Sequence, residues 1–183
     1  MKRGVAFAAA GVLLTILAAL PSVHPQIPSG REVVSPSAYV SREPVARGSW
    51  FQIAVVAKIR PGFHINARQP SAEYLIPTDL RAELPAGFKT AGEIAYPKGE
   101  LRTFAFSKTP LNVYEDNIVL RLPVAAQGDA PLGAQHIPLK LRYQACSNEV
   151  CLPPVTLDVV AALTVAASTT NSRPTHPELF PAH

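Results

Sequence analysis

The chain has 183 residues, with 17 Lys and Arg against 13 Asp and Glu, and a formal net charge of +4. Lys2 and Arg3 account for half of this surplus, so the remaining balance of 15 basic and 13 acidic residues leaves only +2. A charge this small and scattered argues against a nucleic-acid-binding surface, and we expect no nucleic-acid partner. No phosphate-binding or dinucleotide-binding motif appears, and we expect no cofactor. Residues 32–165 suffice for one domain with its own core.

The N-terminus predicts export. Lys2 and Arg3 precede an uncharged apolar run over residues 4–20, which Pro21 and Ser22 interrupt. A basic start, an apolar stretch and a small polar exit are typical of a secretory signal, and we assign residues 1–22 to it. The run is just shorter than the ~20 residues of a membrane-spanning helix, so a retained membrane anchor is the alternative. Under either interpretation the rest of the chain is exported, where thiols can oxidise.

Residues 23–31 are expected to form a Pro/Ser-rich linker, and residues 166–183 a proline-broken, disordered tail. Between them, apolar residues alternate with polar ones, as in strands with one buried face. Turn-forming Pro and Gly separate these runs, and no amphipathic helix interrupts them. We therefore predict an all-β, immunoglobulin-like antiparallel β-sandwich. The predicted strands are residues 51–59, 80–84, 118–124, 137–145 and 155–163.

The only two cysteines, Cys146 and Cys151, lie between the last two predicted strands. If those strands form a hairpin, facing Cα atoms ~4.5–5.5 Å apart permit a disulfide across its neck. Pro153 and Pro154 follow and would end the strand pairing there. Closing so small a ring adds only about 2 kcal/mol by the loop-closure relation. The residues alone leave two interpretations open, a structural clip and an accessible redox pair.

The stretch YQACSNEVCLPPV at 143–155 carries a resemblance, supported by GFHINARQP at 62–70 and VYEDNIVLRLPV at 113–124. Together they resemble the N-terminal periplasmic domain of the thiol:disulfide interchange protein DsbD, over residues 33–165. The resemblance implies an immunoglobulin-like sandwich in which Cys146 and Cys151 are the redox pair.

The resemblance also implies partners. In that family the cysteines take reducing equivalents from a membrane-embedded thiol reductase and pass them to disulfide isomerases and to thioredoxin-like proteins of cytochrome c biogenesis. The sequence does not show the membrane domain or the thioredoxin-like domain of the family's long chains. We therefore expect an exported, stand-alone, monomeric module of the protein-disulfide reductase type that acts with separate partner proteins.

Further site residues follow from the resemblance. A capping loop is expected within residues 101–116, where Phe104 or Phe106 would shield the disulfide. His64 and Asn66 fall where the family has residues near its active site. A histidine there would stabilise a thiolate or move a proton, and the alternative is a partly exposed turn histidine.

Two more residues are expected to flank the cysteines. Tyr143 continues the apolar face of its strand, which predicts a structural role or a ring beside the disulfide. Glu149 lies between the cysteines and would raise a thiol pKa by charge repulsion.

Two other functions compete with the relay. The cysteines and His64 have the soft ligands that Cu(I) prefers, which would make the protein a copper carrier, although we expect no resident metal. An inert hairpin disulfide would instead make it a structural or interaction sandwich.

Overall fold

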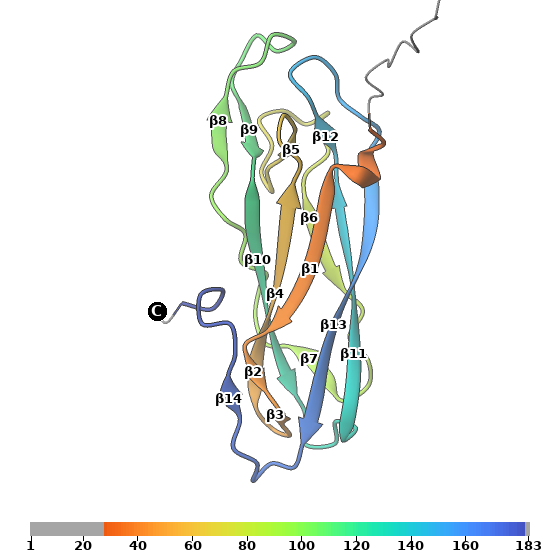
Figure 1. The fold of residues 1–183 in the computed structure, drawn as a ribbon, viewed down its shortest axis with the longest axis vertical. Coiled ribbons are helices and arrows are strands. Elements are labelled where there is room, and N and C mark those ends of the chain that lie inside the picture. The colour runs from red at the N-terminus through yellow and green to blue at the C-terminus, as the bar shows by residue number, and fades with distance from the viewer. Residues whose placement is uncertain (1–27, 182–183) are drawn as a thin grey trace, which may run out of the picture.

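The computed structural model describes residues 28–181, and the predicted signal at 1–22 lies outside them (Figure 1). Two four-stranded sheets pack face to face to form an elongated sandwich. The first sheet has the antiparallel order β1–β4–β10–β7. Its strands are β1 (Val34–Val40), β4 (Trp50–Ile59), β10 (Asn117–Ala126) and β7 (Phe88–Thr90).

The second sheet has the order β3–β13–β11–β6, in which β3 runs parallel to β13 and the other pairs are antiparallel. Its strands are β3 (Val45–Ala46), β13 (Val155–Ala166), β11 (Gly133–Tyr143) and β6 (Asp79–Ala82). This division of the strands corresponds to the A-B-E-D and C-F-G sheets of an immunoglobulin domain, and β3 extends the second sheet. The predicted all-β, immunoglobulin-like antiparallel β-sandwich is confirmed.

The alternation seen in the sequence becomes the core of the sandwich. Along β10, every second residue from Ile118 to Ala126 is buried. Along β13, every second residue from Leu157 to Val165 is buried in the same way. The two inner faces meet in one hydrophobic cluster, to which β4 contributes Phe51, Ile53 and Val55. Burial on this scale supplies the main driving force for folding, so the domain has a core of its own.

A third, smaller sheet lies at one end of the sandwich, the upper end in Figure 1. Its order is β12–β5–β9–β8, with all pairs antiparallel, and we call it the small sheet. Its strands are β12 (Ala145–Cys146), β5 (His64–Asn66), β9 (Leu111–Tyr114) and β8 (Glu100–Arg102). The predicted strand 137–145 is thus divided at Gln144, where the chain passes from β11 to β12.

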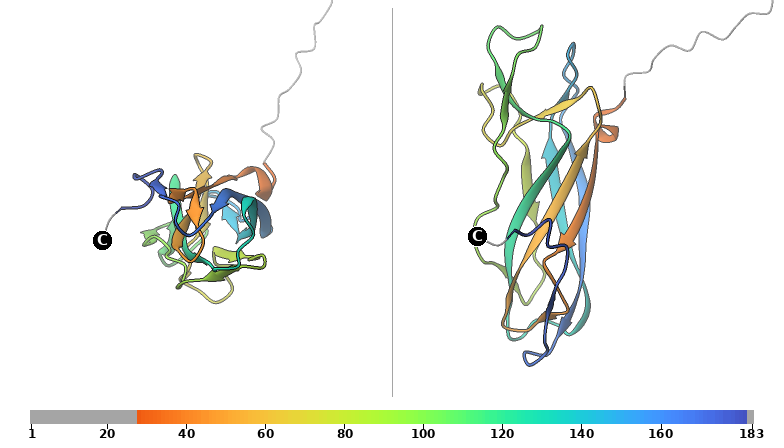
Figure 2. Two further views of the ribbon diagram at one scale, coloured as in Figure 1. Left: turned by 90° about the horizontal axis from the view of Figure 1, so that it is seen from below. Right: turned by 60° about the vertical axis from the view of Figure 1, so that its left-hand side comes forward.

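The C-terminal segment is the clearest difference from the predictions. Residues 166–181 were expected to be disordered, but β14 (Arg173–Pro174) pairs with β2 (Arg42–Glu43) along the sandwich. Thr175 then donates its backbone N–H to Ser41, and the carbonyl of Leu179 accepts a hydrogen bond from Arg121. The right-hand view of Figure 2 shows this segment, coloured dark blue, against the lower half of the molecule. Its prolines and polar residues gave no alternation from which this pairing could be predicted.

The end of the predicted linker also packs on the domain. Gly30–Glu32 form the 3-10 helix η1, and Gly30 is buried. The hydroxyl of Tyr143 donates a hydrogen bond of 2.7 Å to the carbonyl of Gly30, and Arg31 donates to the carbonyl of Thr156. The chain is therefore attached to the sandwich from residue 30 onward.

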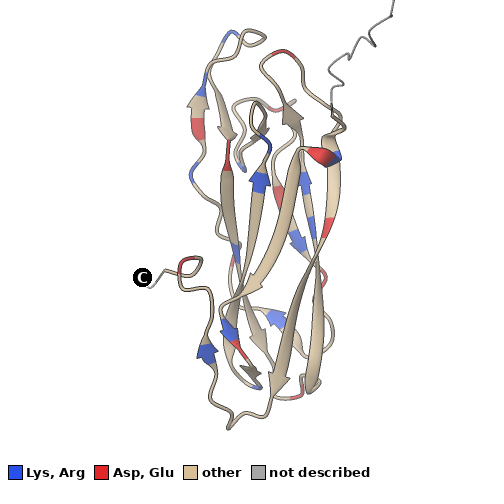
Figure 3. Ribbon diagram, viewed as in Figure 1, with Lys and Arg blue, Asp and Glu red and all other residues tan. Residues whose placement is uncertain are grey.

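Charged residues of both signs are scattered over the described surface (Figure 3). Some pair across strands, as Lys140 does with Asp158 at 2.8 Å. Exposed pairs of this kind contribute little to stability, so the core carries most of it. Within residues 28–181, no helix has the length and apolar character needed to cross a membrane.

The Tyr143–Gly30 contact gives a test of how the N-terminal segment is attached. Tyr143→Phe removes a buried hydroxyl and one of the two donors to the Gly30 carbonyl, the other being the N–H of Val33. We expect the free energy of unfolding to fall by about 1 kcal/mol in urea titrations. Tyr74→Phe, at a 77% exposed tyrosine, is the matched control and should leave it unchanged. Equal stability of the two variants would contradict an energetic role for this bond.

Candidate functional site: the disulfide end of the sandwich

The two cysteines close the hairpin that connects β11 and β13. These strands pair from Gly133↔Val165 to Tyr143↔Val155, and beyond them Cys146 faces Cys151 in an isolated antiparallel bridge. The sulfur atoms are bonded at 2.05 Å, and the Cα atoms lie 3.9 Å apart. The predicted position of the pair at the neck of this hairpin is therefore confirmed.

Hydrogen bonds on both sides hold the hairpin neck in register. Leu152 donates its N–H to the carbonyl of Ala145 at 2.8 Å, and Ser147 donates to the carbonyl of Val150 at 2.8 Å. The hydroxyl oxygen of Ser147 also accepts the N–H groups of Glu149 and Val150, which closes the turn. The cysteine backbone is thus held at both ends of the six-residue segment.

The two sulfurs have different environments. Cys146 has no exposed surface, whereas Cys151 is partly exposed. Thiol–disulfide exchange requires an incoming thiolate to reach a sulfur atom in line with the bond that breaks. Of the two cysteines, Cys151 is the more accessible from solvent.

Strand β5 is placed next to this hairpin by a tight turn. Phe63 donates its N–H to the carbonyl of Arg60 at 3.1 Å, and Gly62 between them has φ +82°. Proline at the second position and a glycine of positive φ at the third match a type II turn. The sequence RPGF thus turns the chain from β4 into β5, where Cys146 pairs with His64 and Ala145 with Ile65.

The small sheet has two different faces. Ile65, Tyr114 and Ala145 belong to the main core of the sandwich. Leu111 and Val113 belong instead to a separate small cluster with Leu75 and Phe104. Directly paired residues point to the same side of a sheet, and neighbours along a strand point to opposite sides.

Alternation therefore places Cys146 and His64 on the second face, together with Val113. We call this the cap side. The disulfide thus lies with the small cluster and not with the core of the sandwich.

Residues 103–110, which we call the cap loop, connect β8 to β9 and cover the cap side. Phe104 is buried and stacks on the His64 ring, with centroids 3.9 Å apart and planes 19° apart. Phe106 stacks on Phe104 at 5.4 Å and is 42% exposed. Of the two residues expected to cap the site, Phe104 is thus the inner one and Phe106 the outer one. The family resemblance did not distinguish them, because the match is interrupted in this segment.

His64 is buried, with 1% of its surface exposed, and its Nε2 atom has no hydrogen-bond partner. The alternative interpretation, a partly exposed turn histidine, is wrong. Burial lowers the pKa of His64 to about 4, and the negative charge of Glu115 opposes this shift. The imidazole is therefore neutral at physiological pH.

The chain matches the family described as "Thiol:disulfide interchange protein DsbD, N-terminal" over residues 31–162, which is most of its length. The chain belongs to this DsbD N-terminal domain family. The resemblance seen in the sequence is confirmed, and the domain of the family includes both cysteines and the small sheet.

The solved structures that resemble this chain include the following two. The first is the DsbD N-terminal domain of Neisseria meningitidis in its reduced form, with 18% identity and a TM-score of 0.45. The match covers 81% of this chain and 94% of that one. The second is the N-terminal periplasmic domain of ScsB from Proteus mirabilis, with 14% identity and a TM-score of 0.46. That match covers 70% of this chain and 46% of the other. A search of curated proteins by sequence found no match.

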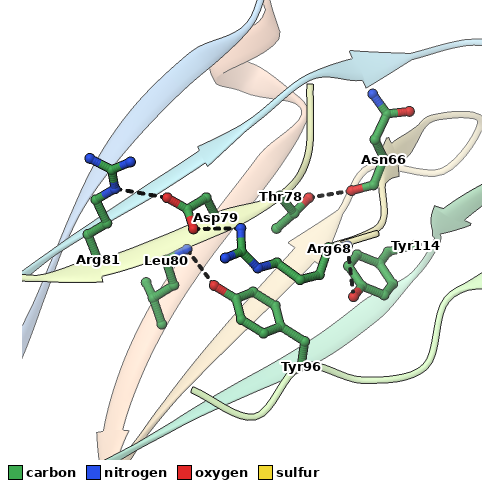
Figure 4. A network of polar contacts seen from close by, with 8 residues as sticks. All are labelled: Asn66, Arg68, Thr78, Asp79, Leu80, Arg81, Tyr96 and Tyr114. Atoms are coloured by element: carbon green, nitrogen blue, oxygen red, sulfur yellow. Dashed lines mark hydrogen bonds and ion pairs between the residues drawn. The ribbon is translucent and has the colours of Figure 1, made fainter. Parts of the chain in front are cut away.

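Asn66, predicted to flank the site, lies fully buried on β5. Its side-chain amide donates to the carbonyl of Ile76 at 3.0 Å and to the side chain of Gln144 at 3.3 Å. Its backbone carbonyl accepts the Thr78 hydroxyl at 2.6 Å, at one end of the polar network in Figure 4. These contacts attach β5 to the segment that leads into β6, so the role of Asn66 in this structure is to hold β5 in place.

Gln144 is the site residue that the sequence analysis missed. Its side chain joins three segments, because it accepts from Asn66 and from the N–H of Ile76 and donates to the carbonyl of Leu152. It thereby ties the disulfide hairpin to β5. A polar residue at the junction of two strands, two positions before a cysteine, was the available signal, but its partners are distant in the sequence.

The other predicted flanking residues lie in different surroundings. Tyr143 is buried in the main core, where desolvation raises its pKa to about 12, and its hydroxyl is bonded to Gly30. Glu149 is exposed on the turn between the cysteines. Among residues 28–181, no three His, Cys, Asp or Glu side chains gather closely enough to form a metal site.

The burial of His64 predicts a pH-dependent stability. Since its pKa is about 4 in the folded chain and ordinarily 6.5, the unfolded chain binds more protons between these values. Stability should be complete above pH 6.5 and fall as the pH drops to 4, by up to about 3 kcal/mol. Urea titrations of the oxidised protein at pH 7 and pH 4 measure this.

His64→Phe should reduce this pH dependence, and His136→Gln, at an exposed histidine of β11, should retain it. If the His64→Phe protein loses as much stability at pH 4 as the wild type does, His64 is not its source.

Proposed function

We propose that this domain is an exported thiol–disulfide exchange module that relays reducing equivalents between partner proteins through a reversible Cys146–Cys151 disulfide. Its membership of the DsbD N-terminal domain family supports this. The observation that carries the proposal is the disulfide at the neck of the hairpin, with Cys151 partly exposed and Cys146 buried.

The exchange needs no cofactor. A thiolate of the electron donor attacks Sγ of Cys151, the Cys146–Cys151 bond breaks, and Cys146 leaves with the electron pair and takes up a proton. A second donor thiol then releases the reduced domain. In the second half, the thiolate of Cys151 attacks a disulfide of the acceptor, and Cys146 resolves the mixed disulfide. The acceptor leaves reduced, and the domain is oxidised again.

The small ring favours this role over that of an inert clip. The cysteines are five positions apart, so the bond adds only about 2 kcal/mol by loop closure. The sandwich has an extensive core that does not depend on it. A bond that contributes so little to stability can be broken and remade without unfolding the domain.

The partners follow from the same proposal. A membrane-embedded thiol reductase would be the donor, and disulfide isomerases or thioredoxin-like proteins would be the acceptors. The predicted signal at residues 1–22 would deliver the chain to the periplasm, or anchor it there if it is retained. The domain would act as a protein-disulfide reductase only together with these separate proteins.

The reduction potential separates a working bond from a structural one. We expect a value above about −300 mV, because structural disulfides lie below that value. Equilibration with glutathione or dithiothreitol buffers, followed by alkylation and mass measurement, determines it. A value well below −300 mV would favour the structural sandwich with an inert clip.

A trapping experiment tests the partners. Cys146→Ser removes the buried, resolving thiol and leaves Cys151 free to attack, so mixed disulfides with partners should accumulate in cells. The matched variant Cys151→Ser leaves only the buried thiol and should trap far less. Captured proteins are identified by mass after non-reducing electrophoresis. Failure of both variants to capture any thiol-redox protein would remove the support for a relay.

A further inference from the structure

We propose that His64 is the general base that takes the proton from the Cys146 thiol when Cys146 resolves a mixed disulfide on Cys151. This inference rests on the proposed exchange function. It says which group takes the proton when the buried thiol of Cys146 attacks.

The first argument is the position of His64. It is the direct cross-strand partner of Cys146, and both side chains lie on the cap side of the small sheet. Side chains paired in this way have Cβ atoms about 4.5–5.5 Å apart, which brings an imidazole nitrogen close enough to meet a thiol. The strand register thus pairs His64 with Cys146 and not with Cys151.

The second argument is the unpartnered nitrogen. A buried polar atom without a hydrogen bond is costly, and native structures rarely retain one without a reason. Nε2 of His64 is such an atom in the disulfide form, in which neither sulfur carries a proton. Reduction creates an S–H donor on Cys146, the residue that pairs with His64 across the strands. The oxidised site therefore contains a buried imidazole nitrogen that no hydrogen bond uses.

The third argument is the need for a base. Cys146 is fully buried, and burial in apolar surroundings raises a thiol pKa and disfavours the thiolate. Cys151 is partly exposed and can lose its proton to water. The buried thiol of Cys146 cannot pass its proton to water in this way. A neighbouring neutral imidazole can accept that proton instead.

The charged groups around His64 do not oppose this role. The carboxylate of Glu115, the residue after β9, favours the protonated imidazole, and Arg102 of β8 donates a hydrogen bond to it at 3.0 Å. The cap loop covers the ring with Phe104, and its Lys108 is exposed. Glu149 on the hairpin turn is exposed as well. Stacking on Phe104 keeps the imidazole dry and neutral until the proton is transferred.

The proposed step balances as follows. The Cys146 thiol gives its proton to Nε2 of His64, and the resulting thiolate attacks Sγ of Cys151. The Cys146–Cys151 bond forms while the bond between Cys151 and the partner sulfur breaks. The partner sulfur leaves with the electron pair and takes a proton from the imidazolium or from water. The domain is oxidised and the partner is reduced.

Stopped-flow oxidation of the reduced protein by 2,2′-dithiodipyridine separates the two thiols. Attack by Cys151 releases a first thiopyridone, and resolution by Cys146 releases a second. Cys146→Ser should show only the first phase, which identifies it. In the wild type, the rate of the second phase should rise around the pKa of His64, about 4, and then level off before pH 7. Without a base it would instead rise tenfold per pH unit toward the ordinary thiol pKa of about 8.5.

His64→Gln keeps a polar side chain but cannot accept the proton. We expect the second phase at pH 7 to slow by roughly 100-fold and to regain the tenfold rise per pH unit, while the first phase is unchanged. His64→Phe tests the same point with an aromatic ring, and His136→Gln should behave as the wild type. The wild-type pH profile is decisive even if neither His64 variant folds.

Two results would overturn the role of His64. One is a second-phase rate that rises steadily up to pH 8.5 in the wild type, and the other is a second-phase rate that is unchanged in His64→Gln. The relay survives either result as long as two thiopyridones are released. Release of only one thiopyridone by the wild type would instead show that no intramolecular disulfide forms, and the proposed function itself would fail.

Discussion

Two residue pairs between β12 and β5 connect the disulfide hairpin to the rest of the site. Ala145 pairs with Ile65 and Cys146 with His64, and through β5 the hairpin is joined to β9 and the cap loop. This pairing places the buried Cys146 beside His64, on which Phe104 stacks, while Cys151 remains partly exposed.

The small sheet lies between two hydrophobic clusters, one on each of its faces. On one face, Ile65, Tyr114 and Ala145 complete the main core, which anchors the sheet to the sandwich. On the other face, the cluster of Leu75, Phe104, Leu111 and Val113 is small and is closed by a loop. Only Phe104 of that loop belongs to the cluster, and regions with few buried apolar residues open at a lower free energy than a core does. The arrangement combines a rigid support for the sulfur atoms with a cover of limited stability.

Polar contacts help to fix the register of the short strands at this end of the molecule. Gln144 and Asn66 join the hairpin, β5 and the segment before β6 through side-chain amides. The side-chain NH₂ of the buried Asn66 would lose both of its hydrogen-bond partners in another register, so the bonds disfavour other registers of the short strands. The register matters because a shift of one residue would turn Cys146 toward the main core and Ala145 toward the cap.

The sequence by itself determined the long strands, the hairpin of the two cysteines and the segment that holds the cap. Alternation over residues 51–59, 118–124 and 155–163 is a local pattern, and the spacing of Cys146 and Cys151 is local too. Only the tertiary structure decided that Phe104 is the inner ring, that His64 is buried beside Cys146, and that residues 173–174 pair with β2. These outcomes depend on contacts between segments tens of residues apart, in strands of two to four residues too short to show a period. The positions of these residues depend on which strands pair and which side chains become buried. No local sequence pattern encodes either.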